Sequence, residues 1–474
     1  MKLLLFIGVM LAGSLSVTAQ NNGTLTVEQY MDEVKSHNPE ARAAVDNIAS
    51  FQLRDSEAEV PLMTEFYGQY NKRDDKKPTQ VPFFMGNETQ TEQWRAGFRK
   101  QSEYGLGADL YFNSQRTIIE GVDPHTFPVN NFMESSAVLA LTQNLWRNGF
   151  GEGTRAQVDA KRAANDVSLL QAKFALKTLL LNAQNAYWSV VSYNQVVKLQ
   201  TENVERAKKL RDYMANRTKM KLFDDTDSMQ AQAAFETREL ELQSSLDERA
   251  TLIRQFNTLR GVDSNQIQSL EGLPAQAMLV DTGTSSGGHM TREDFEGLRA
   301  QAKAGVAQAL YAKSQIQPQL DVNASIATNG RDGITPQAYD QTATNRYPTW
   351  SIGVNFSVPI DFGMISDLRG GYRKASAAAD DLRSQAQFSE VRAWEDLVQQ
   401  KKEAQGRFER SLSVEKIQTE LVKREHTRLL NGRATTFEAL NFEQTLALSQ
   451  IQRVQSQLAL LKIHNAIKTF EAKQ

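Results

Sequence analysis

The chain has 474 residues, and its 54 lysine and arginine residues nearly balance its 56 aspartate and glutamate residues, which gives a net charge of −2. This balance removes the main electrostatic driving force for binding nucleic acid, so we expect no nucleic-acid partner. The absence of cysteine excludes disulfides, zinc–thiolate and iron–sulfur sites, and a lipidated N-terminal cysteine. Hydrophobic residues make up 40% of the chain, which is enough apolar material to fold.

The first residues have the three-part layout of a secretory signal. Lys2 precedes a largely apolar run from Leu3 to Leu11, and a small and polar stretch follows that ends at Ala19. We therefore expect residues 1–19 to be a signal peptide. Beyond it, no stretch reaches the ~18 continuous apolar residues of a membrane-spanning helix. The exported protein is then either soluble or crosses a membrane as a β-barrel.

Two long segments are predicted to be helical. Residues 154–260 contain neither glycine nor proline, and residues 372–474 contain no proline and only two glycines. Apolar residues recur in both at alternating steps of four and three, the 3.5-residue repeat of a left-handed coiled coil. The two seams consist of Leu179, Ala183, Ala186, Val190, Tyr193 and Val197, and of Ala447, Ile451, Val454, Leu458 and Leu461.

A polar break interrupts each helical segment, at residues 216–225 and 431–436. We therefore predict two helical hairpins, over residues 152–260 and 365–472. At ~1.5 Å per residue, the first arm of each hairpin would be about 100 Å long, which exceeds a single globular domain.

Alternating segments precede the hairpins. In the second half, apolar residues alternate with small polar ones in 320–326 and 350–358, the period of a strand with one apolar face. Each run has about nine residues, enough for a tilted strand to cross a bilayer, although a soluble sheet with one buried face would show the same alternation. The first half is less regular, so the chain has four strands, or six if that half adds a hairpin turning near 100–103. First-half strands are predicted at 62–70, 94–98, 104–112 and 137–146.

The order of these segments suggests an internal duplication of helix, strands and long hairpin. The first repeat covers residues 20–260, with strands within 61–146, and a linker is expected at 261–290. The second repeat covers residues 291–474, with a helix at 291–317 and strands within 318–359.

Four strands cannot close a barrel, because about eight is the smallest number that does, and lipid does not tolerate an open sheet edge. A membrane-inserted chain would therefore have to oligomerise. Three chains with four strands and four helical arms each would supply twelve strands and twelve helices.

The sequence resembles the TolC-like outer-membrane factors, the exit ducts of Gram-negative tripartite efflux pumps and type I secretion systems. The resemblance covers essentially the whole mature chain and depends on the order and spacing of several short motifs. These are an opening helix at 25–30 followed by Asn38 and Pro39, a strand-to-helix junction at 143–146 with Gly149 and Gly151, and hairpin tips at 226–231 and 432–441.

This resemblance implies a mostly α-helical homotrimer. A twelve-stranded β-barrel in the outer membrane would continue into a twelve-helix barrel in the periplasm, with an equatorial belt drawn from residues 26–56, 261–317 and the C-terminal tail. The implied function is a passive export channel without a cofactor. A periplasmic adaptor, or membrane fusion protein, would open it, and an inner-membrane transporter would power it.

Three aspartates, Asp224, Asp225 and Asp227, cluster at the first hairpin tip. Aspartate at the start of a returning helix commonly caps it and complements its dipole, which is one interpretation. The other is functional, because in a threefold assembly these carboxylates would recur as rings at the periplasmic mouth.

The resemblance also assigns a periplasmic gate. Carried over by position, the gate residues are Asp227 in the first tip and Glu438 and Asn441 in the second. The arginine and tyrosine that form the family's ionic latch correspond here to Ala434 and Leu429, so we expect closure to depend on apolar packing between the tips more than on ion pairs.

Other classes of protein have less support. No two histidines are three or four residues apart, and there is no nucleophile elbow or glycine-rich phosphate loop, so we expect neither an enzyme nor a metal site. His426 and His464 are interpreted as surface or seam residues of helices. The alternatives are a soluble periplasmic coiled-coil adaptor or structural protein, which membrane fractionation would reveal, and an exported hydrolase.

Overall fold

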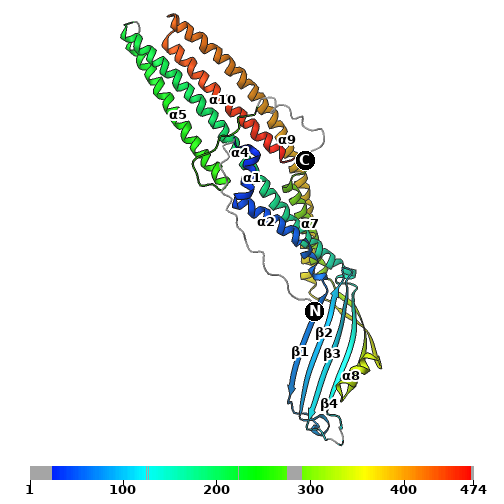
Figure 1. Cartoon of the computed structure of the whole chain (residues 1–474). Helices are drawn as coiled ribbons and strands as arrows, with labels where there is room; N and C mark the ends of the chain where they lie inside the picture. Colours follow the sequence, from blue (N-terminus) through cyan, green and yellow to red (C-terminus); the bar gives the residue numbers. More distant parts are fainter. Residues whose placement is uncertain (1–23, 124, 126–127, 222–223, 275–290, 471–474) are drawn as a thin grey trace. The chain divides into compact units, whose positions relative to one another are not determined.

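The computed structural model describes residues 24–123, 125, 128–221, 224–274 and 291–470, so the predicted signal peptide lies outside the described residues. The chain is mostly helical with one β-sheet and divides into two compact units. The helical unit comprises Met1–Ala44, Ala175–Met290 and Ala393–Gln474, and the sheet unit comprises Val45–Phe174 and Thr291–Arg392. Figure 1 shows the elements of both units.

The sheet unit contains a six-stranded antiparallel sheet in which every strand pairs with its neighbours in the sequence, in the order β1-β2-β3-β4-β5-β6. Four strands come from the first half of the chain and two from the second, so the first half does supply two strands more than the four-strand count. The turn predicted near 100–103 lies between β2 and β3, whereas the β1–β2 hairpin reverses within residues 76–87. The twelve barrel strands expected from the sequence assumed four strands in each of three chains. The strands are β1 (Glu65–Asp75), β2 (Glu88–Gln101), β3 (Leu106–Glu120), β4 (Asn131–Asn144), β5 (Gln319–Asp332) and β6 (Tyr347–Ser357).

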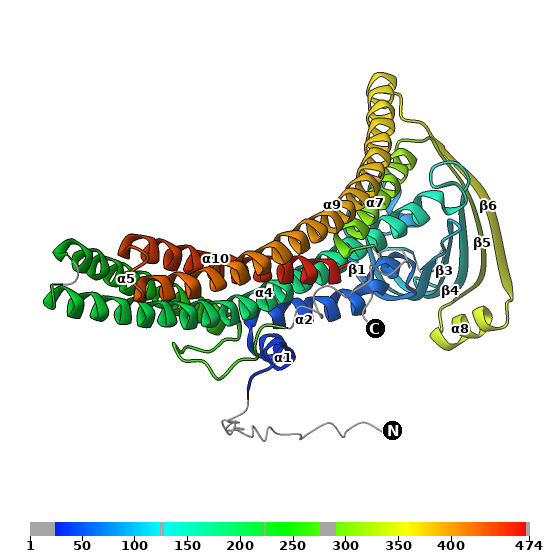
Figure 2. The same cartoon turned by 90° about the horizontal axis from the view of Figure 1, so that it is seen from above.

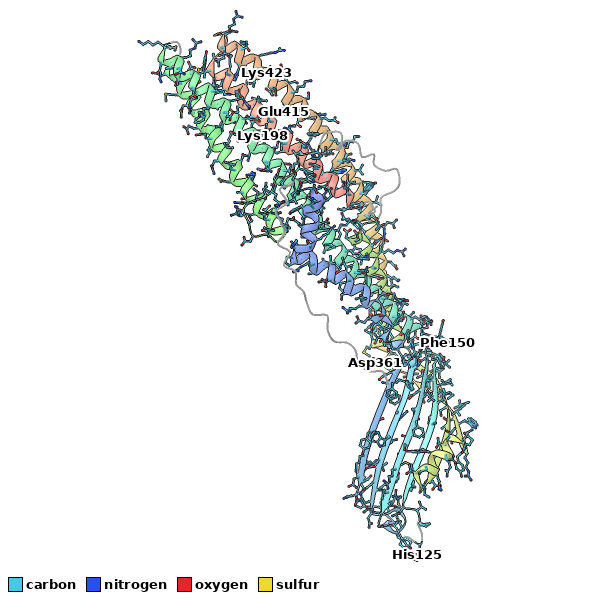
Figure 3. The ribbon with its side chains drawn as sticks, in the orientation of Figure 1. His125, Phe150, Lys198, Asp361, Glu415 and Lys423 are labelled. Atoms are coloured by element: carbon cyan, nitrogen blue, oxygen red, sulfur yellow. The ribbon has the colours of Figure 1, made fainter. Side chains whose placement is uncertain are left out.

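The two ends of the sheet are distinguished by the residues that lie there. Figure 3 shows Phe150 and Asp361, which precede the long helices, at one end, here called the proximal end, and His125 at the opposite, distal end. The unit also contains the first parts of two long helices, α4 (Glu152–Lys219) and α9 (Phe362–Leu430). The other elements with residues in it are α2 (Pro39–Leu53), η1 (Arg54–Leu62), α3 (Pro82–Met85), η2 (Gly149–Gly151), α7 (Glu293–Gln315) and α8 (Thr335–Ala343).

The strand-to-helix junction at the proximal end depends on a tight turn. Asn148 has a left-handed backbone, and its side-chain oxygen accepts a hydrogen bond from the backbone N–H of Thr154 at 2.7 Å. Gly151 has a φ of +80°, and a Cβ built there would lie 1.8 Å from the carbonyl oxygen of Glu103. Only glycine fits, which explains part of the motif found in the sequence.

The helical unit contains parts of four long helices, α4 (Glu152–Lys219), α5 (Asp225–Leu259), α9 (Phe362–Leu430) and α10 (Thr436–Lys468). Figure 2 shows that these helices run alongside one another in this unit, with α4 and α5 forming one hairpin and α9 and α10 the other. Among the described residues, no helix combines the length and the apolar character needed to cross a membrane.

The core of this unit lies where α1 (Val27–His37) packs on the long helices. Tyr30 stacks on Phe256 with ring centroids 4.1 Å apart, and Tyr187 meets the edge of Trp188 at 5.1 Å. The hydroxyl of Tyr187 donates to the carbonyl of Leu25 at 2.7 Å, and burial raises the pKa of this tyrosine to about 12. The pair Tyr187 and Trp188 is therefore part of the core.

Asn38 explains the Asn-Pro motif. Its side-chain oxygen accepts hydrogen bonds from the backbone N–H groups of Glu40 and Ala41 at 2.8 and 3.1 Å, which caps α2. Pro39 occupies the first position of that helix, where no N–H is needed. The Asn38 amide also donates to the carbonyl of Leu259 at 2.8 Å, which ties the start of α2 to the end of α5.

Candidate functional site

The first hairpin tip contains the three aspartates. Asp224 is the N-cap of α5, and its carboxylate accepts a hydrogen bond from the N–H of Asp225 at 2.7 Å. Asp225 is exposed and Asp227 half-buried in the first helical turn, where the helix dipole favours negative charge. Asp224 thus has the capping role. In the described part of a single chain, no three acidic or histidine side chains are grouped closely enough to hold a metal ion.

The second tip contains Glu438 and Asn441. Thr435 and Glu438 form a capping box, in which the Glu438 carboxylate accepts the N–H of Thr435 at 2.9 Å and the Thr435 hydroxyl oxygen accepts the N–H of Glu438 at 3.2 Å. The hydrogen bond from the Thr435 backbone holds the pKa of the exposed Glu438 carboxyl below its usual value. Asn441 is exposed on the same helix. The gate candidates therefore fall into two groups, three aspartates in one tip and Glu438 with Asn441 in the other.

An apolar cluster joins the two hairpins near their tips. This tip cluster has buried members on all four long helices, and Ala434 and Leu440 pack against it. Leu429, one of the two positions where the resemblance predicted no latch residue, is 3% exposed within the cluster. In one chain, apolar packing therefore holds the tips together. The buried members are Leu210 and Met214 of α4, Ala231 of α5, Leu429 of α9 and Ala439 of α10.

A buried ion network also crosses between the hairpins, and we call it the Glu443 network. The carboxylate of Glu443 on α10 accepts from Nε of Arg206 on α4 at 3.0 Å, and Nε2 of His426 on α9 lies 2.8 Å from its other oxygen. The Glu443 side chain is 14% exposed. Its burial acts to raise its pKa, but the close contact with His426 and the positive charge and hydrogen bond of Arg206 together outweigh burial and lower the pKa.

The sequence did not reveal this network. His426 was interpreted as a surface or seam residue, and its side chain is 39% exposed with Nε2 2.8 Å from the carboxylate of Glu443 on α10. Arg206 and Glu443 are 237 positions apart, so no local spacing connects them. The signal available in the sequence was Glu443, a charged residue four positions before Ala447 in the apolar seam of the last helix.

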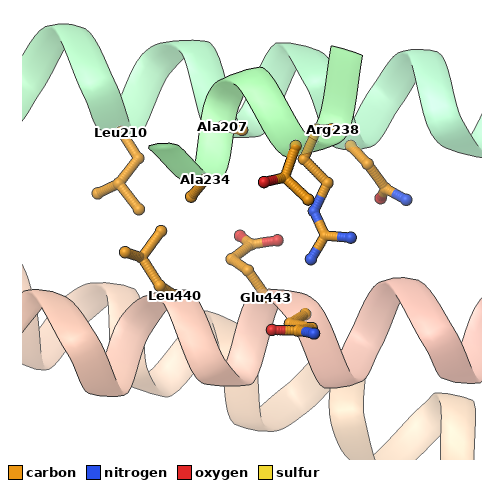
Figure 4. Close-up of a pocket in the computed structure, with 9 residues that line it drawn as sticks. Ala207, Leu210, Ala234, Arg238, Leu440 and Glu443 are labelled. Atoms are coloured by element: carbon orange, nitrogen blue, oxygen red, sulfur yellow. The ribbon is translucent and has the colours of Figure 1, made fainter. Parts of the chain in front are cut away.

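A small cavity of about 120 Å³ lies beside the network, between α4, α5 and α10. Figure 4 shows Leu210 and Leu440 facing each other at one side of it, with Arg238 and Glu443 at the other. The side chains near the tips are therefore apolar toward the turn and charged farther along the helices.

The sheet has a continuous apolar face. The registers between strands place one apolar side chain of each strand in a single row across the sheet, namely Phe66, Phe98, Leu110, Leu139, Ile326 and Trp350. Other large apolar residues of this face extend the row into a band, and they are exposed in the single chain: Tyr70, Trp94, Leu106, Phe112, Leu141, Ile352, Val354 and Phe356. We call these fourteen residues the apolar band.

The opposite face of the sheet is polar. Arg95 lies over the ring of Tyr111 at 3.6 Å and pairs with Asp109 at 3.5 Å, and the hydroxyl of Tyr67 donates to Asp109 at 2.8 Å. The two faces thus differ as the lipid-facing and water-facing sides of a membrane strand do.

The band ends toward the distal end of the sheet. On β1 and β2, a salt bridge of 2.9 Å between Lys72 and Glu92 lies beyond the apolar residues. On β3 to β5, α8 covers the same face, with its Tyr339 ring 5.8 Å from that of Phe112 and Thr342 hydrogen-bonded to Ser135 at 2.6 Å. The band is therefore bounded by charged and hydrogen-bonded groups.

No protein-family model matches the chain, and no curated protein matches its sequence. Solved structures do match. The outer-membrane channel OprN aligns with a TM-score of 0.64 at 14% identity, over 94% of this chain and 89% of that one. The outer membrane protein VceC from Vibrio cholerae aligns with a TM-score of 0.63 at 16% identity, over 93% and 95%. The CmeC outer membrane channel from Campylobacter jejuni aligns with a TM-score of 0.60 at 14% identity, over 99% and 93%.

These alignments span nearly the whole of each chain, so this chain has the fold of the outer-membrane channels to which it is similar. The TolC-like fold indicated by the sequence motifs is confirmed.

Proposed function

We propose that this protein is a passive export duct in the outer membrane of a Gram-negative bacterium. The apolar band carries the proposal. On β6 its residues are largely exposed in the single chain, with Trp350 75%, Ile352 69% and Val354 63% accessible. An exposed apolar surface of this extent requires a partner, and lipid on one face with water on the other accounts for both faces of the sheet. The similarity to outer-membrane channels supports the same conclusion.

The proposed assembly is a homotrimer with an internally duplicated protomer. Unpaired sheet edges are not tolerated in lipid, so the strands of several chains must close into a barrel. The described part of each chain has four long helices, and three chains would supply a twelve-helix barrel in the periplasm. A periplasmic adaptor would bind this helical barrel, and an inner-membrane transporter of a tripartite efflux pump or type I secretion system would deliver the cargo.

The proposed gate lies at the hairpin tips. Three copies of Asp224, Asp225, Asp227, Glu438 and Asn441 would surround one narrow axis, where like charges repel unless cations offset them. The tip cluster and the Glu443 network both connect the two hairpins of a chain. We propose that these contacts hold the closed state, and that adaptor binding separates them.

A soluble periplasmic coiled-coil adaptor is the alternative. It would share the helical hairpins but would have no use for an exposed apolar band on a sheet. An enzyme is not proposed, because the features above require no catalytic group.

Fractionation and mass measurement test the duct. The protein should be found in the outer-membrane fraction and should behave as a trimer after extraction in detergent, and planar bilayers containing it should conduct ions. A stable monomer in the soluble periplasmic fraction would overturn the proposal.

A further inference from the structure

We propose that all six strands of each chain enter the barrel wall, and that the β6 edge of one chain pairs with the β1 edge of the next. Three chains would then build a barrel of eighteen strands instead of the twelve expected from four strands per chain. This inference rests on the proposed trimeric duct and specifies its subunit interface.

The pairing of the β1–β2 hairpin supports a wall of six strands per chain. β2 pairs with β3 from Glu88 opposite Glu120 to Gln101 opposite Gly107, which is the whole length of β2. The outer edge of β3 is therefore already occupied. A twelve-stranded ring in which β3 meets the next chain would have to break this ladder, and each unsatisfied backbone group in lipid costs several kcal/mol.

The side chains of the hairpin point to the same environment as those of the other strands. Phe66 and Phe98 meet with ring centroids 5.2 Å apart, and Tyr70 and Trp94 meet at 4.5 Å. All four rings are exposed and belong to the apolar band. A hairpin that projected into water would leave these rings without a partner, whereas a hairpin in the wall places them against lipid.

The edges are also suited to each other in direction. Consecutive strands are antiparallel throughout, so β1 and β6 run in opposite directions and can form one more antiparallel pair. Along the registers, the centre of the band moves by roughly one residue per strand, as expected for strands tilted in a barrel. Continuing this shift by one strand places Gln69 of β1 opposite Gly353 of β6 in the neighbouring chain, with both on the polar face.

The wider barrel has a functional consequence. Barrel diameter grows about linearly with strand number, so eighteen strands give a lumen about one and a half times as wide as twelve. The proposed duct would then accept bulkier cargo in its outer-membrane section, lined by the polar face around Arg95 and Tyr111.

Disulfide cross-linking tests the interface directly, because the natural chain has no cysteine. Gln69→Cys is combined with Ser351→Cys, Gly353→Cys or Asn355→Cys, which lie on the same face and allow for a shift in register. A Cβ at residue 353 has no atom within 4 Å in the single chain, so that substitution has room. Oxidation in membranes should give intersubunit cross-links with at least one pair, at least tenfold more than with Gln69→Cys and Ile352→Cys, which face opposite sides.

A competing set distinguishes the two barrels. Tyr111→Cys on β3, combined with the same three cysteines on β6, should cross-link only if β3 meets the next chain. Cross-links from β3 but not from β1 would overturn the eighteen-stranded barrel and leave the trimeric duct intact. A monomer without cross-links would overturn both. Electron cryomicroscopy of the unmodified trimer provides an independent count, in which eighteen strands support the inference and twelve refute it.

Discussion

A single charge on the apolar band should impair assembly of this protein in the membrane. Val354 lies between Ile352 and Phe356 on β6 and opposite Val322 of β5. It is therefore inside the band, away from the charged boundary on the distal side. Val354→Arg would put a guanidinium against lipid at this depth.

The expected cost depends on depth. Arginine on the lipid face of a barrel costs about 2–4 kcal/mol at the bilayer midplane and about 0–1 kcal/mol near the interfaces. Because Val354 is within the band, the larger figure applies, and it corresponds to a loss of about 30- to 700-fold in the folding equilibrium for each protomer. A trimer would contain three such substitutions.

The adjacent residue provides a matched control. Asn355 is on the polar face and lies opposite Asp321 of β5, so Asn355→Arg would place the same side chain toward water and next to a carboxylate. The trimer fraction in membranes and the urea dependence of refolding into lipid vesicles measure both variants. Val354→Arg should lower both quantities, and Asn355→Arg should leave them close to those of the unsubstituted protein. Equal damage from the two substitutions would refute a lipid-facing band and indicate a sheet packed on both faces.

Other predictions concern the gate and the helical core. Divalent or trivalent cations on the periplasmic side should reduce single-channel conductance, and Asp227→Ala with Glu438→Ala should weaken this block. An unchanged block would show that these carboxylates do not bind the blocking cation. Glu443→Gln should raise resting conductance and lower the free energy of unfolding by about 1.5–3 kcal/mol, the range for a buried hydrogen bond to a charged group. Glu420 is an exposed partner of Lys423, and Glu420→Gln should change neither quantity. Salt alone should change resting conductance only in proportion to bulk ion concentration, because buried pairs are screened weakly. Burial, with Lys468 and Lys401 nearby, lowers the pKa of His464 from 6.5 to about 4, so its neutral ring stabilises the fold above pH 6.5 and this stabilisation is lost as the pH falls toward 4. The decrease in thermal midpoint from pH 7 to pH 5 should be smaller in His464→Gln, and an equal decrease would contradict the assignment.

Local patterns in the sequence were sufficient for several features. Long stretches without glycine or proline predict the long helices, because these two residues are the main breakers of helices. The strict alternation in 350–358 predicts a strand with one apolar face, since side chains of a strand point to opposite sides in turn. The Asn38 and Pro39 motif marks a helix start because the two residues satisfy different needs of the first turn. The TolC-like fold was recognisable from the order of such local features.

Other features depended on residues distant in sequence. The charged residues Lys72 and Glu92 lie on the apolar face and interrupt the alternation of β1 and β2, so membership of this hairpin in the sheet became visible only through its pairing with β3. Arg206 and Glu443 form an ion pair only because two helices from different hairpins lie side by side. Periodicity reports which face of one element is apolar, and it carries no information on which neighbour that face meets. Strand partners, the tip cluster and the Glu443 network were therefore decided by the tertiary structure.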